Sequence, residues 1–339
     1  MLNWYLQSGK ESDVVISSRV RLARNLAEFP FETKCSKEDL RKIEQKIEQA
    51  TPQIGYHLKY LRLRDMDDIT KMSLVEKRLI SPEFVSDKSE NRGILLNDDE
   101  NISIMINEED HLRIQVFASG LEIENLLNLA IEIDEKIGEM LPYAYSEKYG
   151  FLASCPTDAG TAMRASVMVH LPALTQTGNI RKLLEVVSNF GMNIRGIYGE
   201  GSKAIGNMYQ ISNKQSLGIS EKEIIKNIKL VTDKIIEQER LARKYLGKNS
   251  IELEDYVYRE YGKLIKCRKI SWEECKELLS AVKLGTDLGV IRELTDLKVN
   301  KIDLYSKPAN LQKYLGKQYD SYDRDIKRAE VIKQIVQEV

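Results

Sequence analysis

The sequence predicts an α+β fold in which helices flank an antiparallel sheet, followed by a helical C-terminal domain. Two observations predict it. Segments with strand periodicity lie close together in the first half of the chain, and short connections between successive strands favour antiparallel pairing. Helix-start signals dominate the second half, where no proline occurs between Pro172 and Pro308. We expect one domain at residues 14–243 and a second at residues 244–339.

The strands of the first half are predicted from apolar residues at every second position. Ile102–Ile106 and Leu112–Val116 have this pattern, and Asn107–Asp110 is the predicted turn between them. Ala165–Leu171 and Asn207–Ser212 are also predicted strands. The helices expected between them are Lys37–Ala50, Leu121–Leu141 and Asn179–Asn189.

The second half carries repeated helix-start signals. Ser220 followed by Glu223 is a capping box, and isoleucines at helical spacing come after it. The same signal recurs at Ser271–Glu274, and a further helix is expected from about Thr295. Tyr319–Val339 is again charged and periodic. These signals predict a separate helical unit from about residue 245.

Composition limits the classes of protein that the chain can belong to. Its 51 Lys and Arg residues nearly balance 52 Asp and Glu residues, so we expect no direct nucleic-acid binding. No apolar run approaches the ~18 residues that cross a bilayer, and the first residues do not form a signal peptide. The four cysteines are too few and scattered for a disulfide framework. We expect a cytoplasmic protein with reduced thiols and no membrane contact.

Several common catalytic motifs are absent. The sequence contains no GxxxxGK[ST], so it is not a P-loop enzyme, and no GxGxxG or HRD, so it is not an ordinary protein kinase. It also lacks CxxC and HExxH, and its three histidines lie far apart. We therefore expect no protein-bound metal-ligand set.

Three consecutive carboxylates, Glu108, Glu109 and Asp110, occupy the predicted turn between two apolar strands. A solvated acidic turn is one interpretation. The other is a functional site, because rigid strands that display polar loops often carry one. Clustered carboxylates suit a cationic ligand or a general base.

Arginine, rather than lysine, recurs at the edges of the apolar segments. Arginine forks suit phosphate oxygens, although each residue alone could be an ordinary surface charge. Arg19 and Arg21 share one face if their segment is extended. The other members of this set are Arg113, Arg164 and Arg195.

Cys155 precedes a proline in the loop Ser154–Thr161, which is rich in threonine and glycine. This context is compatible with an activated thiolate. A buried structural cysteine is the other, commoner interpretation of such a residue.

Four motifs, taken together and in order, resemble those of the phosphagen (ATP:guanido) kinase family. They are Ser17–Arg21, the NEEDHLR run Asn107–Arg113, the CPTxxGT run Cys155–Thr161 with Arg164, and Arg195–Glu200. The helical second half, with the RDxxRA run Arg324–Ala329, is similar to that of the family's bacterial protein-arginine kinases. The small helical domain that precedes the catalytic domain in metabolite kinases is not expected here.

One departure from the family pattern lies in the cysteine loop. Small-molecule kinases typically read CPTNLGT, whereas this chain has Asp158 and Ala159 in the two central positions. The substitution leaves open whether these two residues contact a substrate.

The resemblance implies a protein-arginine kinase that moves the γ-phosphoryl of ATP, with Mg²⁺, onto arginine side chains. Glu109 is then the catalytic base, Glu200 its partner across the guanidinium, and Cys155 a neighbouring thiolate. Glu108 and Asp110 hold the loop or orient the shell around the metal. The residues implied in nucleotide binding are Ser17, Ser18, Arg19, Val20, Arg21, Arg78, Arg113, Arg164, Ala165, Ser166, Val167, Met168, Arg195, Gly196, Ile197, Tyr198 and Gly199.

The resemblance also implies regulation and partners. Arg324, Asp325 and Arg328 match an allosteric pocket for phosphoarginine in the family, although spacing alone fits a solvated charged face. Expected partners are substrate proteins with accessible arginines, including heat-shock repressors, a Clp-type ATPase or protease, a zinc-finger activator, and a second or further copies of the chain. Two alternatives stay open: a kinase of free arginine or another small guanidino compound, and a non-catalytic phosphoarginine-binding adaptor.

Overall fold

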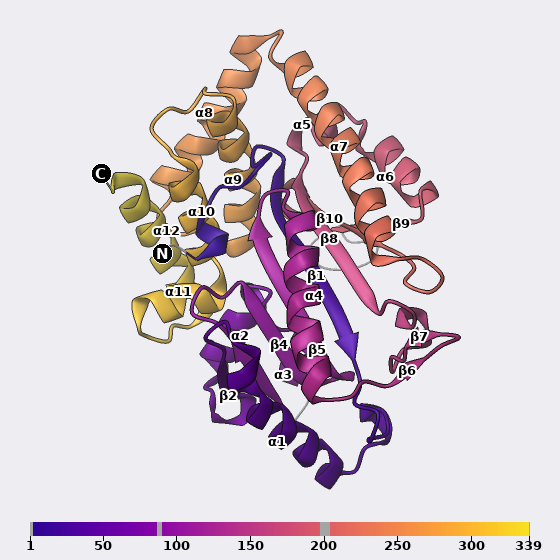
Figure 1. Ribbon diagram of the computed structural model, residues 1–339. Helices are drawn as coiled ribbons and strands as arrows, with labels where there is room; N and C mark the ends of the chain where they lie inside the picture. Colours follow the sequence, from indigo (N-terminus) through magenta and orange to yellow (C-terminus); the bar gives the residue numbers. More distant parts are fainter. Residues whose placement is uncertain (1–2, 87–89, 197–203, 339) are drawn as a thin grey trace.

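The computed structural model describes residues 3–86, 90–196 and 204–338 (Figure 1). Within these residues, eight strands form one sheet in the order β2-β3-β4-β5-β1-β8-β10-β9. Every pairing in this sheet is antiparallel, as predicted. The strands are β1 (Val15–Arg24), β2 (Lys59–Arg62), β3 (Gly93–Leu96), β4 (Ile102–Glu108), β5 (Asp110–Ser119), β8 (Met163–His170), β9 (Met192–Gly196) and β10 (Met208–Asn213), with β6 (Tyr145–Ser146) and β7 (Gly150–Phe151) in a separate hairpin.

The helices confirm the predicted start signals at Ser220, Ser271 and Thr295. Ser220 forms a capping box at the first turn of α7, and Ser271 and Thr295 cap α9 and α10 through their side chains. Ser36 forms a capping box at the first turn of α1 that was not predicted. Such caps satisfy backbone N–H groups that have no partner inside the helix. The helices are α1 (Lys37–Ile54), α2 (Asp68–Glu76), α3 (Pro82–Ser86), α4 (Ile123–Met140), α5 (Pro172–Gln176), α6 (Ile180–Asn189), α7 (Glu221–Leu246), α8 (Ser250–Lys266), α9 (Trp272–Asp287), α10 (Asp296–Tyr305), α11 (Pro308–Leu315) and α12 (Ser321–Gln337).

One face of the sheet is covered by helices and forms the main core. Figure 1 shows α4 crossing this face, and apolar side chains of α1, α4 and α7 join those of the central strands in one buried cluster. Val20 of β1 and Val167 of β8 belong to it, and both are fully buried. Each such side chain contributes about 1.5–3 kcal/mol when it leaves water.

The opposite face of the sheet is apolar only toward β3 and β4. There Ile94, Met105 and Phe117 pack with Phe84 of α3, and Trp4 stacks on Phe117 with ring centroids 5.2 Å apart. Toward β1, β8 and β10 the same face carries polar and charged residues. This asymmetry leaves an open polar surface in the middle of the sheet.

The helices α8–α12 have an apolar cluster of their own and lie beside one end of the sheet (Figure 1). Glu76 of α2 connects the two parts, because its carboxylate accepts hydrogen bonds from the N–H groups of Ala309 (2.7 Å) and Asn310 (2.8 Å) at the start of α11. His170 of β8 is within 2.8 Å of Ser280 of α9. The predicted boundary between residues 243 and 244 falls in the last turn of α7, and the division into two domains stays a prediction.

The turn between β4 and β5 is tighter than predicted. We expected a four-residue turn, Asn107–Asp110, but β4 continues to Glu108 and β5 begins at Asp110, so that Glu109 alone separates the strands. Asn107 and Glu109 have φ angles of 59° and 64°, and this left-handed backbone lets the chain reverse in so few residues. Asn107 is held by hydrogen bonds from its side chain to the carbonyls of Leu40 (3.0 Å) and Asn91 (2.6 Å).

Among the described residues, no helix combines the length and the apolar composition needed to pass through a lipid bilayer.

Candidate active site

The open face of the sheet brings the predicted arginines together. In an antiparallel pair, directly opposed residues point to the same side of the sheet. Arg21 of β1 is opposite Arg164 of β8, and Arg19 is opposite Ser166. Arg195 of β9 lies on the same side, which follows from the pairing across three strands. Arg195 is opposite Gln210 of β10, and Gln210 is opposite Met168 of β8. Met168 is in turn opposite Ser17 of β1, which faces the same way as Arg19 and Arg21.

The charges on this face are crowded. Burial, followed by neighbouring guanidinium groups, holds the pKa of Arg19 well below its ordinary value. The guanidinium groups that act on it are those of Arg21, Arg78, Arg164 and Arg113. Burial and the charges of Arg113 and Arg164 lower the pKa of Arg21 to about 10. Within the described ranges, the side chains of Arg19 and Arg21 have no hydrogen bond and no ion pair, so this cluster is suited to a polyanion such as a nucleotide phosphate.

Arg78 enters the cluster from outside the sheet. It follows α2 and has a φ of 66°, a conformation that residues with a side chain seldom adopt. The backbone N–H of Arg78 donates to the carbonyl of Val75 (2.8 Å), which closes the turn after the helix. The charge of Arg78 acts on Arg19, and the role of Arg78 at the nucleotide site stays a prediction.

Arg113 has partners of opposite charge. It forms ion pairs with Glu108 and, at 2.8 Å, with Glu109, and its nearest approach to Asp110 is 3.8 Å. Burial acts to lower the pKa of Arg113, but Glu108 and Glu109 outweigh it and raise the pKa. Arg113 therefore fixes the turn that carries Glu109, and its predicted contact with nucleotide phosphates stays a prediction.

The turn positions Glu109 at the surface and its two neighbours inside. The Glu109 side chain is 50% exposed, whereas that of Glu108 is 6% exposed and that of Asp110 only 1%. Glu108 accepts a hydrogen bond from the hydroxyl of Ser81 (2.5 Å). Glu109 is thus the one carboxylate of the three that a substrate can reach.

Asp110 joins the turn to the cysteine loop. Its Oδ1 accepts hydrogen bonds from Nδ2 of Asn25 (2.7 Å) and from the backbone N–H of Ser154 (2.8 Å), the residue before Cys155. The Sγ of Cys155 lies 2.9 Å from the hydroxyl of Thr157. The sequence predicted that Asp110 holds the loop, but it gave no signal for Asn25 or Ser154, because these contacts join segments 44 to 85 residues apart.

Four of the residues predicted to bind nucleotide point away from the open face. They alternate along their strands with the residues that face the arginine cluster, and they are Ser18 and Val20 of β1 and Ala165 and Val167 of β8. Val20, Ala165 and Val167 belong to the helix-covered core. The hydroxyl of Ser18 donates to the carbonyl of Gly120 (2.7 Å). These four side chains fix the strands, and only the alternate positions reach the open face.

Part of the predicted site lies outside the described residues. Ile197, Tyr198, Gly199 and Glu200 belong to that segment, so the predicted partner of Glu109 is among them. Gly196 ends β9, opposite Tyr209 of β10. The roles assigned to these residues stay predictions.

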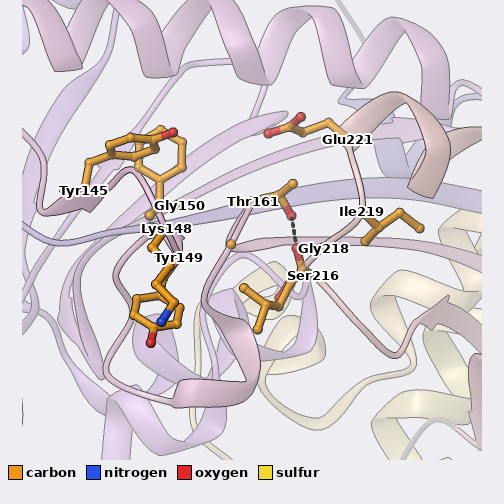
Figure 2. A pocket seen from close by; sticks show the side chains of 12 residues that line it. Tyr145, Lys148, Tyr149, Gly150, Thr161, Ser216, Gly218, Ile219 and Glu221 are labelled. Carbon is orange, nitrogen blue, oxygen red and sulfur yellow. Dashed lines mark hydrogen bonds between the residues drawn. The ribbon is translucent and has the colours of Figure 1, made fainter.

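A shallow pocket of about 290 Å³ lies at the base of the cysteine loop. Figure 2 shows Tyr145, Tyr149 and Lys148 on one side of it, and Glu221 on the other side. The Gly160 backbone forms part of its wall, and a Cβ there would come within 2.5 Å of the Ser216 carbonyl. The loop and the segment at Ser216 are therefore packed backbone to backbone, which limits movement of the loop that carries Cys155.

The RDxxRA run lies in α12, away from the sheet. Arg328 is 1% exposed, and its guanidinium donates to the carbonyls of Ser306 (2.6 Å) and Ile270 (2.7 Å) and to Asp325 (2.5 Å). Among the described residues, the Nε of Arg324 is buried without a hydrogen-bond partner. Arg328 therefore has a structural role at the junction of α9, α10 and α12, and Arg324 is the arginine with an unsatisfied donor.

Comparisons with known proteins agree with this geometry. Residues 41–242 match the family described as ATP:guanido phosphotransferase, C-terminal catalytic domain. Residues 250–339 match the protein-arginine kinase McsB C-terminal domain. A protein-arginine kinase of Halothermothrix orenii is 48% identical over 333 residues, which cover 98% of this chain and 95% of the relative. The chain belongs to the protein-arginine kinase family.

Other relatives and solved structures support the same placement. A protein-arginine kinase of Bacillus subtilis is 44% identical over 338 residues, covering 98% of this chain and 92% of the relative. The crystal structure of a lombricine kinase superposes with a TM-score of 0.60 and 25% identity, covering 69% of this chain and 68% of that one. A duplicated taurocyamine kinase from Schistosoma mansoni, with bound components of a transition-state analogue, gives a TM-score of 0.59 and 30% identity, and the match covers 68% of this chain and 33% of that one. The α+β fold with an antiparallel sheet and a helical C-terminal region is therefore that of phosphagen kinases of the protein-arginine kinase type.

Proposed function

We propose that this member of the family transfers the γ-phosphoryl group of ATP to arginine side chains of proteins. One observation carries the proposal. The open face of the sheet with Arg19, Arg21, Arg164 and Arg195, here called the arginine face, lies next to the tight turn that exposes Glu109. Asp110 of that turn is hydrogen-bonded to the loop of Cys155. The two charges suit the two reactants, since a triphosphate is anionic and a guanidinium is cationic. Glu109, Cys155 and the arginine face hold the reacting groups in this proposal.

The guanidinium must lose a proton before it can attack. Its pKa lies above ~12, and the protonated form is a poor nucleophile. Glu109 accepts this proton, the nitrogen bonds to the γ-phosphorus, and the bond to the bridging oxygen breaks to release ADP. Glu200 holds the other side of the planar guanidinium, and the Cys155 thiolate adds negative charge beside it. Positioning of this kind lowers barriers by about 7–11 kcal/mol at best.

The arginine face binds and stabilises the phosphates. Negative charge spreads over the γ-oxygens in the loose transition state of phosphoryl transfer. Arg19, Arg21 and Arg164 are fixed in strands, so their donors need little reorganisation when this charge develops. In this proposal Arg78, which follows α2, and Arg195 of β9 also bind the phosphates, next to the three strand arginines.

Mg²⁺ fits this site as an ion held through the substrate. No group of three His, Cys, Asp or Glu side chains suited to a metal comes together in the part of the chain that the structure describes. Mg²⁺ retains several waters and binds mainly through phosphate oxygens in such enzymes, where it neutralises charge between the phosphates. Glu108 and Asp158, whose charges both act on Arg21, would be candidates for orienting its waters.

A polypeptide substrate agrees with the shape of the region around Cys155. The pocket beside the loop is shallow, and its exposed rings, Tyr145 (60%) and Tyr149 (48%), offer contacts to residues that flank a target arginine (Figure 2). A kinase of free arginine or another small guanidino compound is the second candidate. The match to a C-terminal domain characteristic of protein-arginine kinases favours the first.

The test is phosphoryl transfer from radiolabelled ATP to an arginine-rich protein and to free arginine, with acid lability identifying the P–N bond. We expect acid-labile label on the protein and a lower catalytic efficiency with free arginine. Glu109→Gln should lower the rate about 10²–10⁴-fold, whereas Asp99→Asn, in the exposed turn before β4, should leave it unchanged. An equal or higher efficiency with free arginine identifies a metabolite kinase, and no transfer at all identifies an adaptor.

Regulation by phosphoarginine forms a further part of the proposal. Arg324 donates to the phosphate, and Asp325 binds the guanidinium of the ligand, which distinguishes phosphoarginine from phosphoserine. Arg324→Ala is the appropriate variant, because Arg328 also supports the fold through Ser306 and Ile270. It should retain basal transfer and lose the response to added phosphoarginine. An unchanged response would return the RDxxRA run to an ordinary charged helix face.

The cellular role follows from the family resemblance. Substrates include heat-shock repressors, and phosphoarginine marks other proteins for a Clp-type ATPase and protease in the cytoplasm. A zinc-finger protein activates the kinase, and the helical C-terminal region joins copies of the chain into a dimer or a larger assembly.

A further inference from the structure

An apolar groove lies between α6 and α7, on the side of the molecule away from the C-terminal helices (Figure 1). Its volume is about 980 Å³. Large apolar side chains along it are unusually exposed: Phe190 (64%), Leu230 (58%), Leu241 (51%) and Val186 (50%), with Tyr245 (64%) at one end. Contiguous exposed apolar surface of this kind marks binding sites in soluble proteins.

The helix α6 is incompletely covered within the chain. Its ten residues include several apolar side chains, but only Val187 is fully buried, at 2% exposure. Two residues separate the end of α6 from β9, the strand that carries Arg195. An occupant of the groove therefore lies against a helix that is followed, after two residues, by the strand that carries Arg195 of the arginine face.

The geometry of the groove selects a helix as its occupant. Both walls are helices, whose backbone N–H and C=O groups are already bonded internally, so no sheet edge is available to pair with an added strand. The stretch of α7 from Leu230 to Leu246 spans about 24 Å at 1.5 Å per residue, which is between four and five helical turns. An amphipathic helix places apolar side chains at i, i+3, i+4 and i+7 along such a groove.

The charge of the groove selects an acidic partner. Its lining includes two charged residues, Lys182 and Lys234, and both are basic. Lys234 pairs with Glu237 at 3.0 Å across an exposed surface, whereas Lys182 has no ion pair among the described residues. A surface pair of this kind contributes little and is readily exchanged for a partner's carboxylate.

We propose that this groove binds an amphipathic helix of a partner protein, with an apolar stripe flanked by Asp and Glu residues. The apolar stripe covers Phe190, Leu230 and Leu241, and the acidic flanks meet Lys182 and Lys234. The site is separate from the arginine face, so its test does not depend on kinase activity.

The probe is a labelled synthetic helix of about 18 residues, with leucines at i, i+3, i+4 and i+7 and glutamates on both flanks. Fluorescence anisotropy measures its binding to the full chain. Leu230→Glu and Leu241→Glu should each weaken binding about tenfold or more. The matched control is Ile251→Glu, because Ile251 is an exposed (75%) apolar residue of α8 outside the groove, and it should bind as the unmodified chain does.

The charge requirement is tested separately. A peptide in which lysines replace the glutamates should bind more weakly than the acidic peptide, and Lys182→Ala should reduce this difference. Circular dichroism melting curves establish that each variant is folded, and Lys182→Ala, an exposed change, keeps the test valid if a glutamate variant is not folded. Equal binding of the acidic and basic peptides overturns the proposal, as does undiminished binding to folded Leu230→Glu and Leu241→Glu.

Light scattering distinguishes the other occupant, a second copy of the chain. If Leu230→Glu reduces the molar mass of the assembly while Ile251→Glu does not, the groove is an interface between copies and the proposal is wrong. An unchanged molar mass together with weakened peptide binding supports a partner helix.

Discussion

The arginine face should cost stability when no nucleotide is bound, and Arg21→Met tests this directly. Methionine fills a similar length with an unbranched apolar chain and removes the charge. Burial removes water from the Arg21 guanidinium, which also lies among Arg113 and Arg164 with no ion pair in the described part of the chain. Its removal therefore relieves both the cost of desolvation and the repulsion. We expect the variant to be more stable than the unmodified protein and to bind ATP less tightly.

The size of the effect follows from the pKa of Arg21. That pKa is lowered from 12.5 to about 10, and each pKa unit corresponds to ~1.4 kcal/mol between the two protonation states. The unfavourable free energy of the charged guanidinium in this setting is therefore at most about 3.5 kcal/mol. Arg21 is only partly buried, and solvent screening reduces the expected gain to about 1–2 kcal/mol. This corresponds to a rise of a few degrees in the unfolding midpoint, at about 2–4 °C per kcal/mol for a domain of this size.

The assay is thermal unfolding with and without ATP and Mg²⁺. In the unmodified protein, nucleotide at 100 times its dissociation constant should add about 2.7 kcal/mol of stability. Without nucleotide, Arg21→Met should have a higher unfolding midpoint than the unmodified protein. With ATP and Mg²⁺ it should gain much less stability than the unmodified protein does. Arg21→Lys retains the charge but not the planar fork, so it should show no gain in the absence of nucleotide and weaker ATP binding. Arg41→Met, on the exposed surface of α1, is the control and should change neither midpoint.

A lower midpoint for nucleotide-free Arg21→Met would refute the reasoning. It would mean that Arg21 has a stabilising interaction that outweighs the repulsion from its neighbours. An unchanged ATP increment in the same variant would show that Arg21 does not contact the nucleotide.

Three further predictions concern other parts of the molecule. Arg195→Ala should weaken ATP binding and slow transfer together, with partial rescue by Arg195→Lys; calorimetry that finds unchanged affinity argues against a nucleotide role. Burial lowers the pKa of His170 well below its ordinary value, so the native state keeps it neutral while the unfolded chain binds a proton below pH ~6.5. The free energy of unfolding should therefore fall by up to ~1.4 kcal/mol per pH unit below pH ~6.5. Denaturant titrations at pH 7 and pH 5 measure this fall, which should be smaller in His170→Gln than in the unmodified protein. His57→Gln, an exposed control, should show the same fall as the unmodified protein. Glu76→Ala leaves donors at the start of α11 without their acceptor and should cost about 2–4 kcal/mol; an unchanged urea midpoint would show that this contact adds nothing to the junction.

The sequence predicted the two strands on either side of the Glu109 turn because their periodicity is strong, whereas β1, the strand of Arg19 and Arg21, was considered only as a segment that could be extended. Apolar residues at every second position placed Ile102–Ile106 and Leu112–Val116 in strands, and both are confirmed. The short strands β2, β3 and β9 were not predicted. With four or five residues each, they provide too few positions to show a period, and their pairing partners fix them.

The partners of individual site residues depended on contacts that local patterns do not contain. Arg113 was assigned to nucleotide phosphate from its motif, and the motif gave no sign that the tight turn brings Glu108 and Glu109 to its guanidinium. Arg328 was assigned to a phosphoarginine ligand, a prediction that is untested; packing of α9 and α10 against α12 encloses it and supplies two carbonyl acceptors that the sequence did not indicate. In both cases the residue type was informative, and the tertiary neighbours decided what the side chain binds.

The apolar side of the central strands sets the geometry of the polar side. Val20 and Leu22 are buried in the core and alternate with Arg19 and Arg21. A slip of one residue in the register of β1 would expose both apolar side chains and turn both arginines into the core, because side chains alternate between the two faces. Burial of the apolar pair is worth about 3–6 kcal/mol, and a buried unpaired guanidinium costs several kcal/mol more. The same residues that stabilise the fold therefore hold the arginine face opposite β8 and beside the Glu109 turn, so substitutions in this core that shift the strand should reduce catalysis without touching either substrate.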